Sequence, residues 1–407
     1  MHILLIHQAF AAINEAGGTR HHEIARVLAN QGNTITIIAS PISYLTGEKT
    51  PMEDISNDFP RISIYRTYTY PALHKSFFHR AISFFSFMVS SFFRAIRTKN
   101  VDLVWATSPP IFQAFTAWLI ARMKRVPLLF EVRDLWPAFA IAVGVLKSTF
   151  LIRLSLWLEK FLYKNADAIV VNSPGYIDHI KQKGGENINI IPNGSDIALF
   201  SPLPNGKSFR KEHNLSNQFI VMYCGAHGIS NDLEVILRAA QIMKQEKEIV
   251  FIFIGDGKEK PNLVSFAKNN ELENVVFIDP LPKNKLKNAL ASADVCIAIL
   301  KPLDLYKTTY PNKVFDYMAA GKPIVLMIDG EIRKIVENAN CGIFCEPGNP
   351  TALVSTILDL RQNKSLLTKM GTNGKKYLVS HFDRTQLALN MLDVMKKVSE
   401  QKWQRKY

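Results

Sequence analysis

The 407-residue sequence contains only four cysteines and no low-complexity tract. Because no histidine or cysteine cluster lies beside them, we predict reduced, buried thiols and neither a disulfide framework nor a zinc site; these residues are Cys224, Cys296, Cys341 and Cys345. The apolar run at residues 2–6 is too short for a signal peptide, and no basic stretch precedes it. These features predict a cytoplasmic globular protein without a disordered tail.

The fingerprint G-x-G-x-x-G, which follows the first strand of dinucleotide-binding domains, is also missing. The corresponding loops contain only Gly17-Gly18 in the first half of the chain and Gly225-Ala-His-Gly228 in the second. Since those glycines allow a pyrophosphate to approach the backbone closely, their absence disfavours a dinucleotide-dependent dehydrogenase.

The composition is that of a folded protein with an excess of positive charge. An apolar fraction of 47% with 21% charged residues is typical of a globular chain with a sizeable core, and the length favours two domains. The net charge of +14 calls for an anionic partner. Nucleic acid, an anionic membrane surface and phosphorylated ligands are the three candidates.

Short β-branched runs alternate with amphipathic helical stretches, such as residues 20–31, almost to the end of the chain. This alternation predicts an α/β protein with parallel sheets and crossover helices. The expected strands are residues 2–6, 33–39, 61–66, 101–106, 127–131 and 167–172, followed by 219–224, 249–254, 274–278, 294–299, 323–327 and 342–345.

The alternation is broken once, in the turn-rich residues 192–217, which we interpret as an interdomain linker. The predicted domains are residues 1–195 and 196–384, two doubly wound Rossmann-like units that face each other across a ligand-binding cleft. Residues 385–407 form a final helix that could dock on either domain, including back on the first.

Two loops of the first domain carry candidate ligand-binding residues. Gly17-Gly18-Thr19-Arg20 opens a helix after the first strand, where backbone N–H groups and the Arg20 guanidinium suit a phosphate. A structural turn is the alternative. Arg133 and Asp134 follow an apolar strand, at the sheet edge where open α/β folds bind ligands. The alternative there is an ion pair of Arg133 with Glu131 or Asp134.

Two glycine loops follow strands in the second domain. Gly225-Ala-His227-Gly228 suits a phosphate, and Gly255-Asp256-Gly257 suits a ribose or a base. Each loop is weak evidence alone, but their repetition at sheet ends indicates a ligand site.

The most specific segment is 310–323, with the sequence YPNKVFDYMAAGKP. Pro311 predicts the first turn of a helix, and Gly321 predicts its end. Lys313 and Asp316 are three residues apart and therefore share one helix face. The cation can meet a phosphate and the carboxylate can accept ribose hydroxyls. An amphipathic helix with one surface ion pair is the alternative.

These motifs, together with Ile191-Pro-Asn-Gly-Ser-Asp196 and the segment from Gly330-Glu331 to Gly342, resemble glycosyltransferase family 4, the retaining enzymes of the GT-B fold. The resemblance covers nearly the whole chain. It is closest to the bacterial branch that builds O-antigen and capsule, including the L-fucosamine (N-acetylfucosaminyl) transferases.

The resemblance implies a UDP-sugar donor bound mainly by the second domain and an acceptor bound by the first. Asp316 matches the second acidic position of the family's E-x7-E motif and looks like the ribose ligand, while Thr308 occupies the first position. The family's usual Arg and Lys for the diphosphate are absent after strand 219–224. We expect phosphate neutralisation instead from, in order, Lys313, Arg20, His227 and Lys307.

The resemblance also implies the course of catalysis. Arg133 replaces the family's first-domain histidine, and Asp134 would orient or deprotonate the acceptor hydroxyl. No D-x-D sequence occurs, so neither a metal nor another cofactor is expected, and cations would stabilise the leaving diphosphate. Side chains near Thr308, Gly330 and Glu331 would select the sugar, which we expect to be N-acetylated.

Part of the positive charge lies in residues 74–99, a basic, Phe-rich amphipathic stretch whose uncharged centre, 81–93, is too short to span a membrane. We predict that this helix, and less strongly 146–164, lies on the anionic inner face of the cytoplasmic membrane. A core-packed helix is the alternative. Such a surface suits a polyprenyl-diphosphate-linked saccharide acceptor. Nucleic acid is disfavoured because the charges interleave with an apolar stripe.

Two other functions are compatible with these residues. A non-hydrolysing UDP-sugar epimerase would share the architecture and the donor. A non-catalytic membrane-bound partner protein could keep an altered donor site, as Thr308 and the missing Arg and Lys allow.

Overall fold

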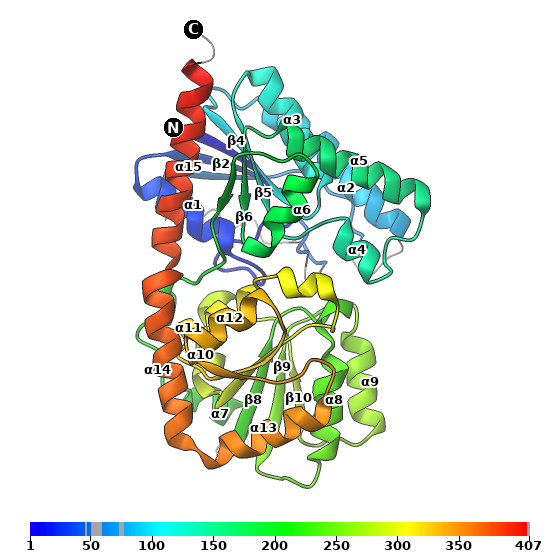
Figure 1. Cartoon of the computed structure of the whole chain (residues 1–407), viewed down its shortest axis with the longest axis vertical. Coiled ribbons are helices and arrows are strands. Elements are labelled where there is room, and N and C mark those ends of the chain that lie inside the picture. Colours follow the sequence, from blue (N-terminus) through cyan, green and yellow to red (C-terminus); the bar gives the residue numbers. More distant parts are fainter. Residues whose placement is uncertain (45–46, 50–58, 73–76, 216, 405–407) are drawn as a thin grey trace. The chain divides into compact units, whose positions relative to one another are not determined.

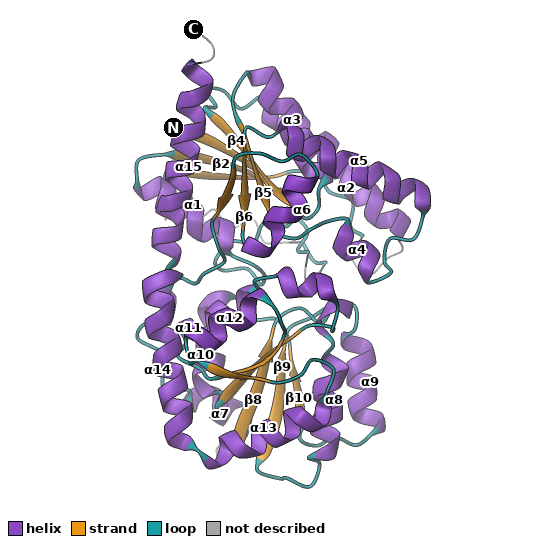
Figure 2. Cartoon of the chain, viewed as in Figure 1, coloured by secondary structure: helices purple, strands orange, loops and turns teal. Residues whose placement is uncertain are grey.

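The computed structural model of the chain describes residues 1–44, 47–49, 59–72, 77–215 and 217–404. The chain forms two compact units. The first contains Met1–Ala12, Gly18–Pro192 and Thr385–Tyr407, and the second contains Ile13–Gly17 and Asn193–Arg384. Each unit is an α/β structure with one parallel sheet (Figures 1 and 2).

The sheet of the first unit has seven strands in the order β3-β2-β1-β4-β5-β6-β7. The strands are β1 (His2–Ile6), β2 (Thr34–Ala39), β3 (Ile62–Arg66), β4 (Leu103–Ser108), β5 (Leu128–Val132), β6 (Ala168–Val171) and β7 (Ile188–Ile190). The helices are α1 (Arg20–Asn30), α2 (Phe77–Ile96), α3 (Phe112–Lys124), α4 (Ala138–Ala142), α5 (Thr149–Asn165), α6 (Ile177–Gln182) and α15 (Arg384–Gln404).

The sheet of the second unit has six strands in the order β10-β9-β8-β11-β12-β13. The strands are β8 (Phe219–Cys224), β9 (Ile249–Ile254), β10 (Val275–Ile278), β11 (Val295–Ile299), β12 (Ile324–Met327) and β13 (Gly342–Phe344). The helices are α7 (Lys207–Glu212), α8 (Leu233–Ile242), α9 (Lys260–Asn269), α10 (Lys283–Ser292), α11 (Asn312–Ala319), α12 (Glu331–Asn338), α13 (Pro350–Gln362) and α14 (Lys364–His381).

Alternation along the strands fills a core on each face of the second sheet. Met222 and Cys224 of β8 pack in one cluster with α10, α11 and α12. Val221 and Tyr223 of the same strand pack in the other with α8 and α13. Because side chains of a strand point alternately to opposite faces, a strand buried on both sides has a continuous apolar sequence. The sheet in turn fixes the positions of the loops that follow its strands.

The predicted parallel α/β architecture is confirmed, with every expected strand within two residues of its predicted position. β7 was not predicted, because a three-residue, partly exposed edge strand has too short a pattern to detect. The four cysteines are buried, as predicted.

The interpretation of 192–217 as a linker is wrong for most of its length. The second unit begins at Asn193, and the segment contains a 3-10 turn at Ile197–Phe200 as well as α7. Phe200 and Phe209 are buried in the core of that unit. A turn-rich segment can thus pack on a core through a few large side chains. Such isolated contacts leave no periodic pattern in the sequence.

The final helix, α15, contributes Leu387, Met391 and Met395 to the core of the first unit, where they pack with α1 and with β1 and β2. The chain therefore returns to the first unit after completing the second. Within the described residues, no helix is long and apolar enough to cross a membrane.

Candidate functional site

The ammonium group of Lys313 lies at the carboxyl end of β8. Pro311 precedes α11 and places Lys313 in its first turn, as predicted. Lys313 Nζ donates hydrogen bonds to Tyr223 Oη at 2.6 Å and Asn231 Oδ1 at 3.2 Å, and it lies 3.9 Å from the centre of the Tyr223 ring. A Cβ atom added to Gly225 would lie 3.2 Å from Nζ, so this ammonium borders the glycine loop after β8.

Lys313 has no carboxylate partner among the described residues. An ammonium has three N–H donors, and the two neutral oxygens engage two of them. Lys313 is half-buried, and desolvation lowers its pKa to about 7. A bound anion would supply the missing counter-charge, so the geometry is that of an anion site.

Asp316 lies one turn further along α11 and has different partners. Its Oδ1 accepts a hydrogen bond from Ser195 Oγ at 2.6 Å. The same oxygen forms an ion pair with Lys283 Nζ at 3.1 Å. Burial raises the pKa of the Cys224 thiol, and the charges of Lys313 and Asp316 also act on it, so both charges lie near the end of β8. The two residues are thus in one region, as predicted, but they do not pair with each other.

The glycines after β8 and β9 allow two loops to pack backbone against backbone. A Cβ atom on Gly255 would lie 1.9 Å from Gly225 O, and one on Gly257 would lie 2.5 Å from His227 O. Asp256 Oδ1 accepts a hydrogen bond from Gly257 N at 2.7 Å. The structure therefore gives Gly255 and Gly257 a packing role that is sufficient without a bound ribose or phosphate.

The prediction that His227 supplies a cation for phosphate is wrong. The imidazole is fully buried among aromatic rings, and neither ring nitrogen has a hydrogen-bond partner among the described residues. Burial, followed by the charges of Lys260 and Lys313, lowers its pKa to about 4. His227 is therefore neutral near pH 7. Gly228, which ends this loop, precedes a 3-10 turn at Ile229–Asn231 that brings Asn231 to Lys313.

The residues predicted to lie around the sugar come together at the start of α12. Gly330 has a φ of +91°, and a Cβ atom there would lie 2.1 Å from Lys307 O, so only glycine fits this close approach. Lys307 is exposed and forms a surface ion pair with Asp304 at 2.8 Å. Thr308 Oγ1 donates to Leu305 O at 2.7 Å, and Glu331 pairs with Lys334 at 2.5 Å.

The prediction that Arg20 binds phosphate is also wrong. Its guanidinium is buried in the first unit and donates to Glu131 Oε1 at 2.8 Å, Pro192 O at 2.7 Å and Ile191 O at 2.8 Å. The preceding glycines do not form a phosphate loop around it. Gly18 N donates to Tyr44 Oη at 2.9 Å, and Gly17 has a φ of +141°.

Glu131 is the centre of a buried polar network that the sequence did not predict. Its Oε2 accepts hydrogen bonds from His21 Nε2 at 2.7 Å and Trp105 Nε1 at 3.1 Å, while Arg20 holds Oε1. Burial raises its pKa, but Arg20 and His21 outweigh this and hold the pKa well below its usual range. The only signal in the sequence was a carboxylate inside an otherwise apolar strand.

Arg133 lies at the carboxyl end of β5, where it was predicted. Its Nε donates to Ser108 O at 3.3 Å, and its Nη2 lies 3.4 Å from Nε2 of the buried His7. No carboxylate pairs with it among the described residues, because Glu131 pairs with Arg20 instead. Asp134 is exposed beside it; the surrounding protein raises the pKa of Asp134 and Arg133 opposes this. The first unit thus also presents an unpaired cation at a strand end.

Comparisons with known proteins agree with this arrangement. Residues 16–194 match the model of the glycosyl transferase 4-like domain, and residues 205–377 match that of the glycosyl transferases group 1. The chain therefore consists of two glycosyltransferase family domains. The two matches meet close to the boundary between the units, so each unit of this glycosyltransferase corresponds to one family domain.

Curated relatives of the glycosyltransferase are distant. One is TuaH of Bacillus subtilis, which is named as a glycosyltransferase of teichuronic acid biosynthesis. It is 24% identical over 228 residues, which cover 54% of each chain. The N-acetyl-alpha-D-glucosaminyl L-malate synthase of Bacillus anthracis is 20% identical over 230 residues, covering 55% of this chain and 58% of the relative. The chain therefore spans about half the length of the curated relatives that it matches.

Solved structures cover the glycosyltransferase almost completely and show that it has the GT-B fold. Sucrose-phosphate synthase from Thermosynechococcus elongatus is 19% identical with a TM-score of 0.78, covering 98% of both chains. Anabaena HepE in complex with UDP-glucose is 16% identical with a TM-score of 0.74, covering 98% of this chain and 100% of HepE. WaaG, of lipopolysaccharide biosynthesis, is 14% identical with a TM-score of 0.70, covering 97% and 99%.

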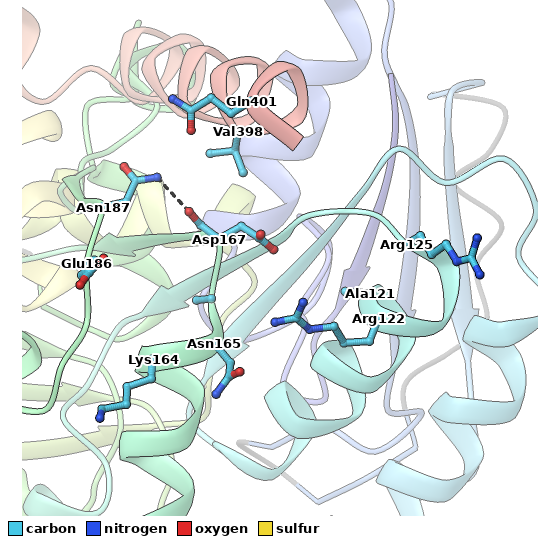
Figure 3. A pocket seen from close by; sticks show the side chains of 11 residues that line it. Ala121, Arg122, Arg125, Lys164, Asn165, Asp167, Glu186, Asn187, Val398 and Gln401 are labelled. Atoms are coloured by element: carbon cyan, nitrogen blue, oxygen red, sulfur yellow. Dashed lines mark hydrogen bonds between the residues drawn. The ribbon is translucent and has the colours of Figure 1, made fainter. Parts of the chain in front are cut away.

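A separate pocket of about 730 Å³ lies in the first unit of the glycosyltransferase (Figure 3). Its lining includes Arg122, Arg125 and Lys164, together with Asp167 and Asn187, which directly precede β6 and β7. It is therefore at the amino-terminal edge of the sheet, opposite the strand ends that carry Arg133. Ligands of open α/β sheets bind at the carboxyl ends, so this pocket is not the candidate active site.

Proposed function

We propose that the protein transfers a sugar, with retention, from a UDP-sugar to a lipid-linked saccharide during the synthesis of a surface polysaccharide. One observation carries the donor assignment: the unpaired, half-buried Lys313 beside the glycine loop after β8. A diphosphate there would receive charge-assisted hydrogen bonds, and the same cation would stabilise the leaving UDP. The HepE complexes with UDP, and with UDP and glucose, support a uridine nucleotide.

The remaining roles follow from the placement of the other side chains. Asp316 would accept hydrogen bonds from the ribose, and the backbone around Thr308, Gly330 and Glu331 would enclose the sugar. In the first unit, Asp134 would orient or deprotonate the acceptor hydroxyl beside Arg133. We propose that the reaction needs no metal, because Lys313 and Arg133 would supply the positive charge that stabilises the leaving diphosphate.

The chemistry of the sugar and of the acceptor is supported by the names of relatives. An N-acetyl-alpha-D-glucosaminyl L-malate synthase is among the curated relatives, and the solved structures include TarM with alpha-GlcNAc-glycerol. TuaH is named for teichuronic acid biosynthesis, and WaaG for lipopolysaccharide biosynthesis. We therefore propose an N-acetylated amino sugar as the donor sugar, with N-acetyl-L-fucosamine among the first to test.

The transfer reaction is tested with UDP-sugars and a lipid extract of bacterial membranes. We expect radiolabel from an N-acetylated UDP-sugar to enter the lipid fraction with the anomeric configuration of the donor. A new UDP-sugar formed without lipid would instead identify an epimerase. Binding of UDP without turnover on any lipid-linked acceptor would identify a non-catalytic partner protein.

The surface of the first unit supports a membrane-bound acceptor. Along α2, Ser83, Phe87, Ser91 and Ala95 repeat every four residues and are buried. The predicted apolar stripe faces outward: Phe85, Val89 and Phe93 are 56%, 58% and 55% exposed, and Ile82, Phe92 and Ile96 are half-buried. Phe78 lies outside the residues whose side chains are described. The helix packs through the face that carries these four residues and not through the predicted stripe, so the alternative of a core-packed apolar stripe is disfavoured.

The second predicted stretch continues this apolar surface. On α5, Phe150, Leu154 and Trp157 are 71%, 44% and 56% exposed. Helix α3 contacts both α2 and α5 (Figure 1), and its Phe112 and Phe115 make ring contacts with Phe85 of α2 and Phe161 of α5. Exposed basic residues flank the apolar surface; they are Arg97, Lys99, Lys147, Arg153, Lys160 and Lys164. We propose that this aromatic surface docks on an anionic lipid membrane.

The triple variant Phe85→Ser, Val89→Ser, Phe93→Ser is expected to lose at least tenfold in affinity for anionic phospholipid vesicles. Each of these side chains would bury apolar area in the lipid. Full burial of one such side chain contributes about 1.5–3 kcal/mol to the free energy of binding. Co-sedimentation with phosphatidylglycerol vesicles measures this. The control Ile242→Ser, Val264→Ser removes exposed apolar side chains from the second unit and should bind normally. The proposal would be contradicted if wild-type protein did not bind the vesicles, or if it dimerised through this surface.

Donor binding is expected to weaken as pH rises above 7. The pKa of Lys313 is lowered to about 7, so the side chain is charged below that pH and increasingly neutral above it. A bound diphosphate raises this pKa, so binding takes up a proton and is tightest at low pH. We expect the Kd for UDP-glucose to rise roughly tenfold between pH 7 and pH 9. Calorimetric titration measures this, and UDP-glucose is suitable because its diphosphate diester does not titrate in this range.

The matched control for this pH dependence is Lys313→Arg. A guanidinium remains charged up to pH 12, so the variant should bind UDP-glucose with a flat pH profile. An equally steep profile in both proteins would mean that another group titrates.

A further inference from the structure

The carboxylate of Asp316 is held on one side only. Ser195 Oγ and Lys283 Nζ both contact Oδ1, at 2.6 Å and 3.1 Å. Oδ2 has no hydrogen-bond partner among the described residues, yet it is not fully buried. The side chain keeps 12% of its surface exposed. One oxygen is therefore engaged by the protein, and the other is an available acceptor.

The two donors are themselves fixed in place. Ser195 is fully buried, its N donates to Phe382 O, and its O accepts from Arg384 N, so the backbone of residues 382–384 sets its position. Lys283 is the first residue of α10 and is 5% exposed. Asp316 thus joins three segments that are far apart in the sequence.

A purely stabilising role explains this arrangement poorly. Desolvating a lysine and a carboxylate costs about as much as their attraction returns, and apolar side chains often replace such a pair without loss of stability. A fixed, ionised acceptor with one free oxygen is, however, what recognition of a vicinal diol needs.

We propose that Lys283 and Ser195 are positioning residues that orient Asp316 for the ribose diol and thereby make the protein select ribonucleotides. This inference rests on the proposed function, since it assumes that the donor ribose binds at Asp316. Lys283 and Ser195 hold Oδ1 and thereby fix the rotamer of the carboxylate, so that Oδ2 accepts from the ribose hydroxyls. Neither residue touches the nucleotide.

The test compares the binding of UDP and 2′,3′-dideoxy-UDP by calorimetry. Wild-type protein should bind UDP at least tenfold more tightly, because hydrogen bonds to a charged group are the strong ones. In Lys283→Met this preference should fall below about threefold, while the Kd for dideoxy-UDP changes little. Ser195→Ala should reduce the preference partially, and it removes only one hydroxyl if Lys283→Met fails to fold. Asp316→Ala is less informative because it removes the proposed ribose acceptor together with the ion pair to Lys283.

The matched control is Lys322→Met. Lys322 is also a partly buried lysine near α10, but it donates to the carbonyl oxygens of Ala291 and Ala293, both at 2.8 Å. Its loss should leave the ribose preference unchanged. Equal weakening of both ligands in Lys283→Met would make Lys283 a structural residue and overturn the inference. No preference in the wild type would instead overturn the assignment of Asp316 to the ribose.

Discussion

Lys313→Met is expected to lower the kcat/KM of sugar transfer by about a thousandfold, equivalent to about 4 kcal/mol of transition-state stabilisation. Lys313 has no carboxylate partner among the described residues, and one of its three donors is unused. Its charge is therefore available to the diphosphate, which gains negative charge as the sugar leaves. Methionine has a similar length and fills the space beside Tyr223 without a buried charge, so the fold should remain intact.

A transfer assay with donor hydrolysis measured separately checks this prediction. Lys247→Met is the control, because Lys247 is an exposed lysine that pairs with Glu273. It should retain wild-type activity. If Lys313→Met retained more than about a tenth of the activity with an unchanged melting temperature, the diphosphate would be bound elsewhere.

Glu131→Ala is expected to destabilise the first unit by about 3–5 kcal/mol, with a fall in Tm of roughly 10 °C. Glu131 is fully buried and accepts hydrogen bonds from Arg20, His21 and Trp105. Its removal takes the carboxylate away from the buried guanidinium of Arg20 and leaves the donors of His21 and Trp105 without this acceptor. Truncation also leaves a cavity beside Trp105.

Tryptophan fluorescence isolates this effect, because all five tryptophans lie in the first unit. Thermal unfolding followed by this signal should shift, whereas UDP binding at low temperature should change little. Glu273→Gln, which alters an exposed ion pair, is the control and should cost less than about 0.5 kcal/mol. An unchanged Tm for Glu131→Ala would mean that Arg20 finds another partner.

The sequence predicted those features of the site that are set by residues close together in the sequence. Pro311 and Gly321 mark the ends of the helix that carries Lys313, and helical spacing brings Asp316 near it. The sequence does not contain the partners of these side chains. Tyr223 precedes Lys313 by 90 residues and Ser195 precedes Asp316 by 121 residues, so only the folded sheet brings them together.

The same limit explains the wrong predictions. Arg20 and His227 stand after glycines at strand ends, which is the local pattern of a phosphate loop. Burial decided otherwise: Glu131, 111 residues away, engages the guanidinium, and a cluster of aromatic rings keeps the imidazole neutral. Local sequence states which charges are present at a strand end, whereas counter-charges and desolvation depend on distant residues.

The sequence alone determined two parallel α/β units, the amphipathic character of α2 and the helix that carries Lys313, because periodicity and helix punctuation are local properties. The tertiary structure decided which charges remain unpaired and which side of α2 faces solvent. Serines can face inward when their hydroxyls bond to backbone carbonyls, as Ser91 does to Met88 O, and Phe85 and Phe93 then face solvent.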